Sequence, residues 1–206
     1  AKMSQILAEL GPEAVKLQAD TFERLVIGQI LETQGPSANE DPLEHYLRVV
    51  ADKTGSLIAT SLRFGSMFAD CSREEIDTLT EFGEKIGIAF QLADDIIDIA
   101  SESHDSGKTP GTDLREGIPT LVTLNAMKSN DPKDASLKLA LSGPIKSEEK
   151  VQWVINELRG HKAMTESRMQ LQKIAKEARA ALGALPISES SSALYSLCDL
   201  VIDRVG

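Results

Sequence analysis

Pairs of helix-breaking residues divide this chain into segments whose apolar residues recur at helical spacing. Gly11-Pro12, Gly35-Pro36, Gly143-Pro144 and Leu185-Pro186 are such pairs, and Asp41-Pro42 has the form of an N-cap followed by the first helical residue. Proline fits the first turn of a helix but not its interior, so these pairs predict where helices begin and end. No alternating strand pattern stands out between them. The sequence therefore predicts an all-α fold.

The three- and four-residue steps between apolar residues give the approximate extent of each helix. Ser72 and Glu75 form a capping box at the start of the longest one. A stretch rich in glycine, proline and serine follows that helix, so residues 106–119 are predicted to be a loop. We expect helices near residues 12–33, 42–62, 72–103, 119–128, 132–142, 147–160, 162–184 and 189–204.

Length and composition suit a single helical domain over residues 1–206. Of the 206 residues, 41% are hydrophobic and 4% are aromatic, and single domains commonly contain about 100 to 200 residues. No window approaches the roughly 18 uninterrupted apolar residues that span a bilayer, and no secretory leader opens the chain. We therefore expect a cytoplasmic protein and not an integral membrane protein.

The net charge excludes one large class of partner. Lysine and arginine number 22 against 32 aspartate and glutamate residues, which gives −10 at pH 7. Nucleic-acid binding requires cationic side chains that neutralise phosphates, so we expect no nucleic-acid partner. An acidic chain can still bind a phosphorylated ligand where divalent cations reverse the local charge. The two cysteines, Cys71 and Cys198, lack metal-type spacing and are expected to be buried, reduced thiols.

The sharpest feature of the sequence is Phe90-Gln91-Leu92-Ala93-Asp94-Asp95-Ile96-Ile97-Asp98, within the longest predicted helix. At about 100° per residue, Asp94, Asp95 and Asp98 fall within an arc of roughly 100°, and Glu102 falls on the same side. Carboxylates on one stripe repel one another, and divalent cations would relieve that repulsion. Mg²⁺ prefers oxygen ligands and commonly binds one or two carboxylates together with substrate phosphate oxygens. The three aspartates are therefore candidate ligands of Mg²⁺.

A solvated acidic helix face is the alternative interpretation of this stripe, and most charge runs are of that kind. Two observations favour metal binding. The aspartates lie in a strongly apolar helix, and no lysine or arginine lies three or four residues from Asp94 or Asp98. Because no neighbour on the helix compensates their charge, a cation site is the favoured interpretation.

Two lysines add positive charge at places that suit a diphosphate. Lys53-Thr54 interrupts an apolar helical segment, and Lys108 lies in the predicted loop after the acidic helix. Each lysine taken alone is more often a surface side chain that extends its charge into water. Gly107-Lys108-Thr109 is similar to the end of a nucleotide-binding P-loop, but Glu102 stands where that motif requires glycine, so a P-loop is rejected.

Taken in order along the chain, these residues resemble the motifs of the polyprenyl synthetases, the trans-type prenyl diphosphate synthase family. Phe90-Gln91 with Asp94-Asp95-x-x-Asp98 resembles the second aspartate-rich motif of that family. Gly28-Gln29 is similar to its Gly-Gln pair, Lys53-Thr54 to its Lys-Thr/Ser pair, and residues 107–117 to the loop that follows. The likeness runs from about residue 7 to the C-terminal helices.

The resemblance implies a fold and an activity. The fold is an antiparallel helical bundle of the isoprenoid synthase type, of which this chain would form the C-terminal two thirds. The activity is prenyl transfer, in which isopentenyl diphosphate condenses with an allylic diphosphate to make a longer trans-prenyl diphosphate. Ionisation of the allylic diphosphate would be assisted by Mg²⁺. A homodimer is also implied by the family.

The same resemblance implies roles for individual residues. The catalytic residues would be Lys53, Thr54, Gln91 and Lys108. The substrate-binding residues would be Gln29, Lys53, Phe90, Gln91 and Lys108. The ligands of Mg²⁺ would be Asp94, Asp95 and Asp98, with the two lysines assisting the metal in holding the diphosphate.

The chain also departs from the family pattern. No second Asp-Asp-x-x-Asp occurs in the 206 residues, so the first aspartate-rich motif is absent and the bundle is expected to be incomplete at its N-terminus. Ile118 stands where many relatives have lysine, which removes one possible cation from the diphosphate site. The resemblance therefore implies neither that this chain is active alone nor how long its product is.

Two alternatives use the same helical class. A non-catalytic regulatory subunit of a heteromeric prenyl synthase would keep the fold without the chemistry, but such a subunit has no physical need for uncompensated carboxylates. A carboxylate-bridged di-iron bundle needs Glu-x-x-His pairs. None of His45, His104 and His161 has glutamate three residues before it, so the di-iron alternative is set aside.

Overall fold

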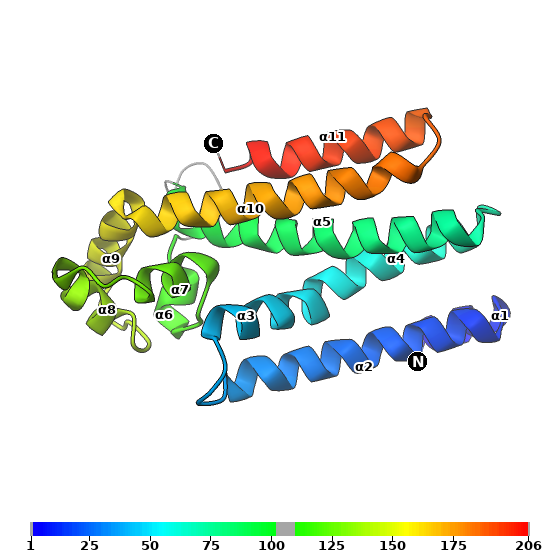
Figure 1. Ribbon diagram of the computed structural model, residues 1–206. Coiled ribbons are helices and arrows are strands. Elements are labelled where there is room, and N and C mark those ends of the chain that lie inside the picture. The colour runs from blue at the N-terminus through cyan, green and yellow to red at the C-terminus, as the bar shows by residue number, and fades with distance from the viewer. Residues whose placement is uncertain (1, 102–109, 206) are drawn as a thin grey trace. The chain divides into compact units, whose positions relative to one another are not determined.

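The computed structural model describes residues 2–101 and 110–205. Every regular element within these residues is a helix, which confirms the predicted all-α class (Figure 1). The helices form two compact units, Ala1–Ala89 with Ile174–Asp199 and Phe90–Lys173 with Leu200–Gly206. All three boundaries between the units fall within helices, in α5, α10 and α11, and each unit is described by itself. The expectation of a single domain over residues 1–206 stays a prediction.

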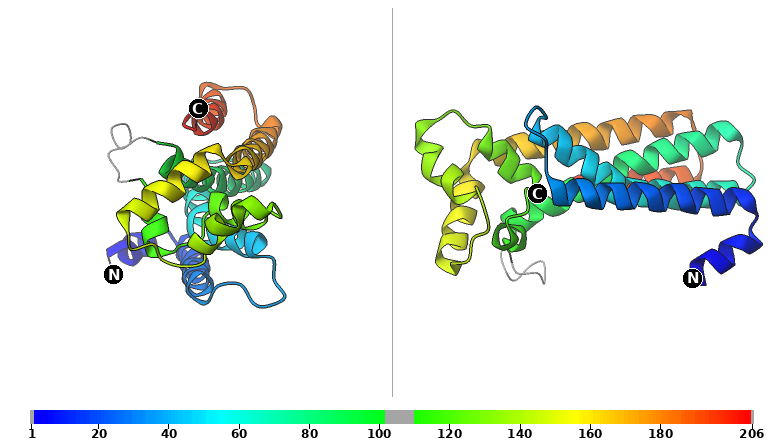
Figure 2. Two further views of the ribbon diagram at one scale, coloured as in Figure 1. Left: turned by 90° about the vertical axis from the view of Figure 1, so that its left-hand side faces the viewer. Right: turned by 90° about the horizontal axis from the view of Figure 1, so that it is seen from below.

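The first unit is built around α2 (Pro12–Gln34). This helix contacts α3 (Pro42–Val50) and α4 (Ser56–Met67). In Figure 1 the ribbons of α2 and α3 are joined by a loop and lie side by side, and they stay adjacent in the views of Figure 2. The unit also contains α1 (Lys2–Glu9) and parts of α5 (Arg73–Ala100), α10 (Lys162–Ala181) and α11 (Glu189–Asp203), with a 3-10 turn at Leu182–Ala184.

The helix starts predicted from capping residues are confirmed. Asp41 accepts hydrogen bonds from the backbone N–H groups of Leu43 and Glu44, and Pro42 is the first residue of α3. At the start of α5, the Glu75 N–H donates to the Ser72 hydroxyl at 3.3 Å and the Ser72 N–H donates to the Glu75 carboxylate at 2.8 Å. These bonds satisfy N–H groups that have no partner within a helix.

The helix predicted over residues 42–62 is interrupted by one turn of π-helix at Ala51–Gly55. Close packing against α2 occurs at this turn, because a Cβ atom on Gly28 would lie 2.9 Å from the Lys53 Cγ and 3.0 Å from the Asp52 Cβ. A single π-helical turn widens the backbone locally and is frequent at functional sites. Apolar spacing alone does not reveal it, since α3 and α4 continue the same helical periodicity on either side.

The second unit begins with the last turns of α5. α5 is the longest described helix, with 28 residues, and it ends at Ala100. The predicted end near Ser103 lies outside the described residues. The unit continues with α6 (Thr112–Glu116), α7 (Leu121–Met127), a 3-10 turn (Pro132–Asp134), α8 (Ala135–Ala140), α9 (Glu148–Gly160) and the first part of α10. Helix α9 packs against α7 and α8.

Two short helices were not predicted: α1, which precedes the first predicted helix, and α6, which lies within the stretch assigned to a loop. Gly111 and Gly117 flank α6 with φ values of 77° and 73°, the left-handed region that glycine adopts without steric cost. Between them, Leu114 is buried and its carbonyl accepts a hydrogen bond from Ile145 N–H at 3.0 Å. The glycines that suggested a loop are therefore the two ends of a helical turn fixed by tertiary contacts.

Each unit has its own apolar core. Most of the large side chains with no more than 2% of their surface exposed come from α5, α7, α9 and α10. In the first unit the buried core includes Val49, Val50, Ala59, Phe82, Ile86, Ala178 and Leu182. In the second it includes Leu92, Ile96, Ile99, Leu121, Val122, Val151, Val154, Ile155, Leu158 and Leu171. No helix in the described part of the chain combines the length and the apolar character needed to cross a membrane.

The two cysteines differ in burial. Cys198 is buried and Cys71 is half-buried, and both are free thiols. The expectation of two buried thiols is therefore correct for Cys198 and wrong for Cys71, which follows the end of α4 at the surface turn before α5. Burial raises the pKa of the Cys198 thiol.

Glycine at position 83 is expected to be required for the contact between α4 and α5. A Cβ atom at Gly83 would lie 2.7 Å from the Ala59 Cα, which is closer than real contacts allow. Gly83→Ala should therefore lower the free energy of unfolding by about 1–3 kcal/mol. In the matched variant Gly65→Ala, the added methyl group meets nothing within 4 Å, and it should stabilise the chain by up to about 1 kcal/mol. Chemical denaturation of both variants tests this, and equal stabilities would contradict the close approach.

Candidate functional site

The acidic stripe predicted from the sequence lies on the last turns of α5, in the second unit. Leu92, Ala93 and Ile96 on the same turns are fully buried, so the helix presents one face to the apolar core. Asp95 is buried, whereas Asp94 and Asp98 are half-buried. The three carboxylates therefore leave water to different extents, and each has a different set of partners.

Asp95 is hydrogen-bonded through both carboxylate oxygens. Its Oδ2 accepts the backbone N–H of Leu121, the first residue of α7, at 2.9 Å. Its Oδ1 accepts the side-chain N–H of Gln91 at 3.2 Å. The first N–H groups of a helix lack intrahelical partners and carry partial positive charge, so a carboxylate at this position is stabilised. Asp95 thus connects α5 to the start of α7 and fixes the orientation of Gln91.

Asp98 has one satisfied and one unsatisfied oxygen. Its Oδ1 accepts the backbone N–H of Thr112 at 3.4 Å, and its backbone carbonyl accepts the N–H of Gly111 at 3.1 Å. Its Oδ2 is buried and has no hydrogen-bond partner among the described residues. Burial raises the pKa of the Asp98 carboxyl above its ordinary value, while the backbone N–H groups of Thr112 and Gly111 act in the opposite direction.

Asp94 is paired with an arginine from the end of the chain. The Arg204 guanidinium donates to Asp94 Oδ1 at 2.7 Å, and its central carbon lies 4.6 Å from the centre of the Phe90 ring. The prediction that Asp94 has no compensating base is therefore wrong. It considered only residues three or four positions away on the same helix, whereas the partner is 110 positions away.

The donor chemistry of the stripe fits a hard divalent cation. Within the described residues, no group of three or more His, Cys, Asp or Glu side chains is arranged to hold a metal ion. Mg²⁺ does not require such a cage, because it usually takes one or two carboxylates and completes its shell with water and phosphate oxygens. The Oδ2 of Asp98 is buried and has no partner in residues 2–101 and 110–205, and it is the kind of atom that a cation would satisfy.

The predicted basic residues of the first unit lie at the π-helical turn. The Lys53 ammonium donates to the Glu32 carboxylate at 2.6 Å, and the Gln29 side chain donates to the same oxygen at 3.0 Å. Glu32 thus brings Gln29 and Lys53 together between α2 and the turn. Thr54 is the next residue of the turn and is half-buried.

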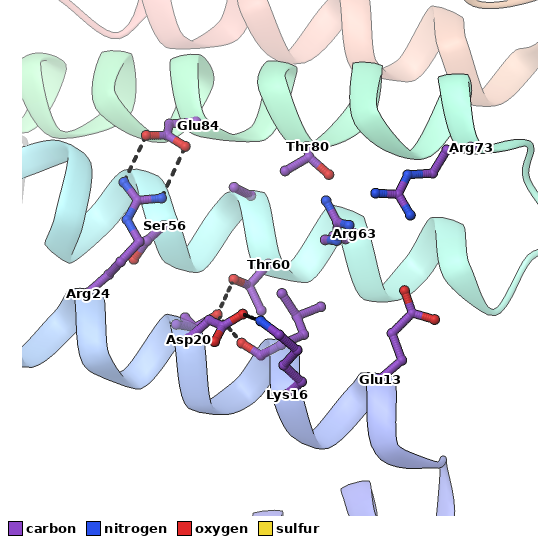
Figure 3. Close-up of a pocket in the computed structure, with 13 residues that line it drawn as sticks. Glu13, Lys16, Asp20, Arg24, Ser56, Thr60, Arg63, Arg73, Thr80 and Glu84 are labelled. Carbon is purple, nitrogen blue, oxygen red and sulfur yellow. Dashed lines mark hydrogen bonds and ion pairs between the residues drawn. The ribbon is translucent and has the colours of Figure 1, made fainter.

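An arginine that was not predicted holds this turn in place. The Arg24 guanidinium donates to Asp52 in the π-helical turn at 2.9 Å and to both carboxylate oxygens of Glu84 on α5, at 2.8 and 3.2 Å. It also reaches the carbonyl of Ala51 at 3.4 Å. Figure 3 shows this fork between Arg24 and Glu84. The network ties the residue before Lys53 to two helices, so Arg24 limits where Lys53 can lie.

The Arg24 network borders an open groove of about 450 Å³ between α2, α4 and α5 (Figure 3). The groove also contains Lys16, Arg63 and Arg73. Lys16 pairs with Asp20 at 2.5 Å, and Arg73 and Arg63 pair with Asp77 at 3.3 and 3.6 Å. Because every one of these cations has an acidic partner, the groove gives no support to a separate anion site.

The predicted site residues fall into two sets. Gln29, Lys53 and Thr54 belong to the first unit, and Phe90, Gln91 and the three aspartates belong to the second. Lys108 and Glu102 lie outside the described residues. Sequence reasoning missed Arg24 and Arg204. Arg24 lies one helical turn before Gly28-Gln29, which was a usable signal, whereas no local pattern marks Arg204.

Comparison with known proteins gives consistent results. The polyprenyl synthetase family pattern matches residues 1–158. Nonaprenyl diphosphate synthase from Mycobacterium tuberculosis is 45% identical over 206 residues, which are 100% of this chain and 62% of that protein. Dimethylallyltranstransferase from the same organism is 36% identical over 202 residues, 98% of this chain and 61% of that protein.

A solved structure agrees with these sequence matches. Geranylgeranyl pyrophosphate synthase from Corynebacterium glutamicum, complexed with calcium and isoprenyl diphosphate, has a TM-score of 0.91 at 41% identity. The match covers 98% of this chain and 63% of that one. The similarity confirms the predicted isoprenoid synthase type of helical fold. The chain spans about three fifths of the length of the relatives named here.

The burial of Asp98 predicts a pH-dependent effect of its replacement in the metal-free chain. A carboxyl whose pKa is raised by folding favours the protonated form, so its contribution to stability is present at low pH and is lost as pH rises through the folded pKa. Asp98→Asn should therefore raise the melting temperature at pH 7, and a gain of about 1 kcal/mol corresponds to about 2–4 °C. The gain should shrink as pH falls toward 3.8, the ordinary value for aspartate. Thermal unfolding at several pH values tests this. A less stable variant at pH 7 would mean that the charged form is favoured by folding.

Proposed function

This chain belongs to the polyprenyl synthetase family, and on that premise we propose that it acts as a trans-prenyl diphosphate synthase. The reaction joins isopentenyl diphosphate to an allylic diphosphate and gives a longer trans-prenyl diphosphate. The observation that carries this proposal is the acidic stripe of α5, where the Asp98 Oδ2 is buried without a partner in the described part of the chain. Its carboxylates suit a cation that carries a substrate diphosphate.

We propose that Asp94, Asp95 and Asp98 hold Mg²⁺. A carboxylate has about four lone-pair sites, so the hydrogen bonds that Asp95 already accepts leave capacity for a metal. When bound, Mg²⁺ would neutralise charge on the diphosphate and make it a better leaving group. The side chain of Gln91, held by Asp95 at 3.2 Å, would then lie near the allylic carbon, and Phe90 would contact the substrate.

The predicted lysines would act as fixed positive charges. Lys53 pairs with Glu32 at 2.6 Å, and its ammonium would exchange this partner for a diphosphate oxygen. Arg24, through Asp52, would keep the turn that carries Lys53 and Thr54 in place. Lys108 and Gln29 would complete the substrate contacts. Charges arranged before the substrate binds stabilise a developing anion more effectively than mobile ones.

The alternative of a non-catalytic subunit is less consistent with the second unit. Asp98 Oδ2 is buried and has no partner in the part of the chain that the structure describes. A subunit without catalytic function has no use for such an atom, because leaving it unsatisfied costs about 1–3 kcal/mol. The relatives at 45% and 36% identity are named as synthases or transferases. A cytoplasmic location stays a prediction from the sequence.

The proposed metal site predicts that diphosphate binding depends on both Mg²⁺ and Asp94. Calorimetric titration of the chain with an allylic diphosphate should show binding with Mg²⁺ and none without it. Asp94→Asn should weaken that binding by at least about tenfold. The matched control is Asp77→Asn, because Asp77 is also an α5 aspartate paired with arginine, and it should bind normally. Binding that is independent of Mg²⁺ would refute the proposed metal site.

We also propose that the chain forms a homodimer through α2. One face of this helix carries exposed apolar residues at three- and four-residue steps, and they are Val15, Ala19, Phe22, Val26 and Ile30. Phe22 is 65% exposed. This spacing places the five side chains in one seam along the helix, and a two-fold interface places the same patch on both partners. A second copy of the chain is therefore the proposed occupant of this face.

The dimer proposal predicts opposite outcomes for two charge substitutions. Phe22→Glu places a carboxylate in the seam and should convert the dimer to monomers in sedimentation velocity. Leu139→Glu is the control, because Leu139 is 75% exposed on α8 and outside the seam, and it should leave the dimer intact. A wild-type chain that sediments as a monomer, or a dimeric Phe22→Glu variant, would contradict the proposal.

A further inference from the structure

Arg204 follows the last residue of α11 and makes two separate contacts with the C-terminal part of α5. Its guanidinium donates to Asp94 Oδ1 at 2.7 Å and lies over the Phe90 ring at 4.6 Å. The Arg204 and Asp94 side chains are 33% and 28% exposed. One cation thus engages both a predicted metal ligand and a predicted substrate-binding residue of the second unit.

The turn that carries Arg204 is fixed to the second unit by its backbone. The Arg204 N–H donates to the Leu200 carbonyl at 3.2 Å, and the Val205 carbonyl accepts a hydrogen bond from Arg168 at 3.0 Å. Val201 and Val205 are buried on either side. Because the backbone is held, a long arginine side chain can leave Asp94 by rotation about its own bonds while the turn stays in place.

We propose that Arg204 is a tethered counter-ion, which occupies Asp94 when no metal is bound and competes with a divalent cation for that carboxylate. This inference rests on the metal-binding role proposed for Asp94. In the absence of metal, Arg204 relieves the repulsion between Asp94 and its acidic neighbours. A cation bound to the Asp94 carboxylate would repel the guanidinium, so the two positive charges compete for this group.

Competition has a measurable consequence, since removal of the tethered cation strengthens metal binding. The pair is partly exposed, and ion pairs of this kind are weak. Arg204→Met keeps the length of the side chain and removes its charge, so it should increase the affinity of the metal-free chain for Mn²⁺ by about two- to fivefold. Arg204→Lys retains a charge without the planar fork, and its affinity should lie between those of the wild type and Arg204→Met.

The experiment measures free Mn²⁺ by electron paramagnetic resonance while the 206-residue chain is titrated without any diphosphate. Arg179→Met is the matched control, because Arg179 combines the same two contacts, an ion pair to Asp199 at 2.9 Å and a cation–π contact to Tyr195 at 4.9 Å. Neither partner belongs to the acidic stripe, so this variant should bind Mn²⁺ as the wild type does. Equal affinities of Arg204→Met and the wild type would overturn the proposal.

A further variant separates failure of this proposal from failure of the metal site. If Asp94→Asn binds Mn²⁺ as tightly as the wild type, the metal site at Asp94 is wrong and the counter-ion has no role. If Asp94→Asn loses Mn²⁺ while Arg204→Met is unchanged, only the counter-ion proposal fails.

A measurement on the wild-type chain covers the case in which Arg204→Met does not fold. Addition of Mg²⁺ should shift the NMR signal of the Arg204 Nε–H group, because its surroundings change when the guanidinium leaves Asp94. The Arg179 Nε–H signal should stay in place. An Arg204 signal that does not move at Mg²⁺ concentrations that saturate the site would overturn the proposal.

Discussion

A carboxylate removed from water needs donors, and in the second unit this need connects three segments to one helix. The last turns of α5 carry three aspartates on a face bordered by fully buried apolar side chains. Asp95 accepts a hydrogen bond from the first N–H of α7, and Asp98 accepts hydrogen bonds from N–H groups at the start of α6. Asp94 forms an ion pair with the guanidinium of Arg204. Each pairing places a different element against α5. The charges proposed for chemistry are thus also the contacts that organise the unit.

The first unit uses the opposite arrangement, in which a cation is the centre. Arg24 joins α2 to the π-helical turn through Asp52 and to α5 through Glu84. Gly28 lets α2 approach that turn closely, since a Cβ atom there would meet the Lys53 side chain at 2.9 Å. The position of Lys53 therefore depends on the lack of a side chain at Gly28 and on the bidentate ion pair between Arg24 and Glu84.

Local chemistry explains what could be predicted from the sequence. The caps at Asp41 and at Ser72 with Glu75 act within one helical turn, so their residue types are sufficient to locate α3 and α5. The acidic stripe follows from helical spacing alone. The motif order along the chain supplied the family, which a match over residues 1–158 then showed.

Contacts between distant segments explain what could not be predicted. Helix α6 exists because Gly111 and Gly117 have positive φ and because Leu114 packs and bonds to residue 145, while composition alone suggests a loop. The π-helical turn depends on packing against Gly28, and the spacing of apolar residues along the sequence does not reveal this packing. Arg204 compensates Asp94 from 110 positions away. Helical periodicity describes neighbours within a turn, and these three features depend on partners outside it.

The sequence separation between two contacting residues also determines how soon their contact can form while the chain is being synthesised. Asp95 and Leu121 are 26 positions apart, so their hydrogen bond can form soon after α7 has been made. The partner of Asp94 is Arg204, which is synthesised 110 positions later. During translation at about 5–20 residues per second, the stripe spends several seconds with Asp94 unpaired. During that interval Asp94 lacks the partner that it has in the finished chain.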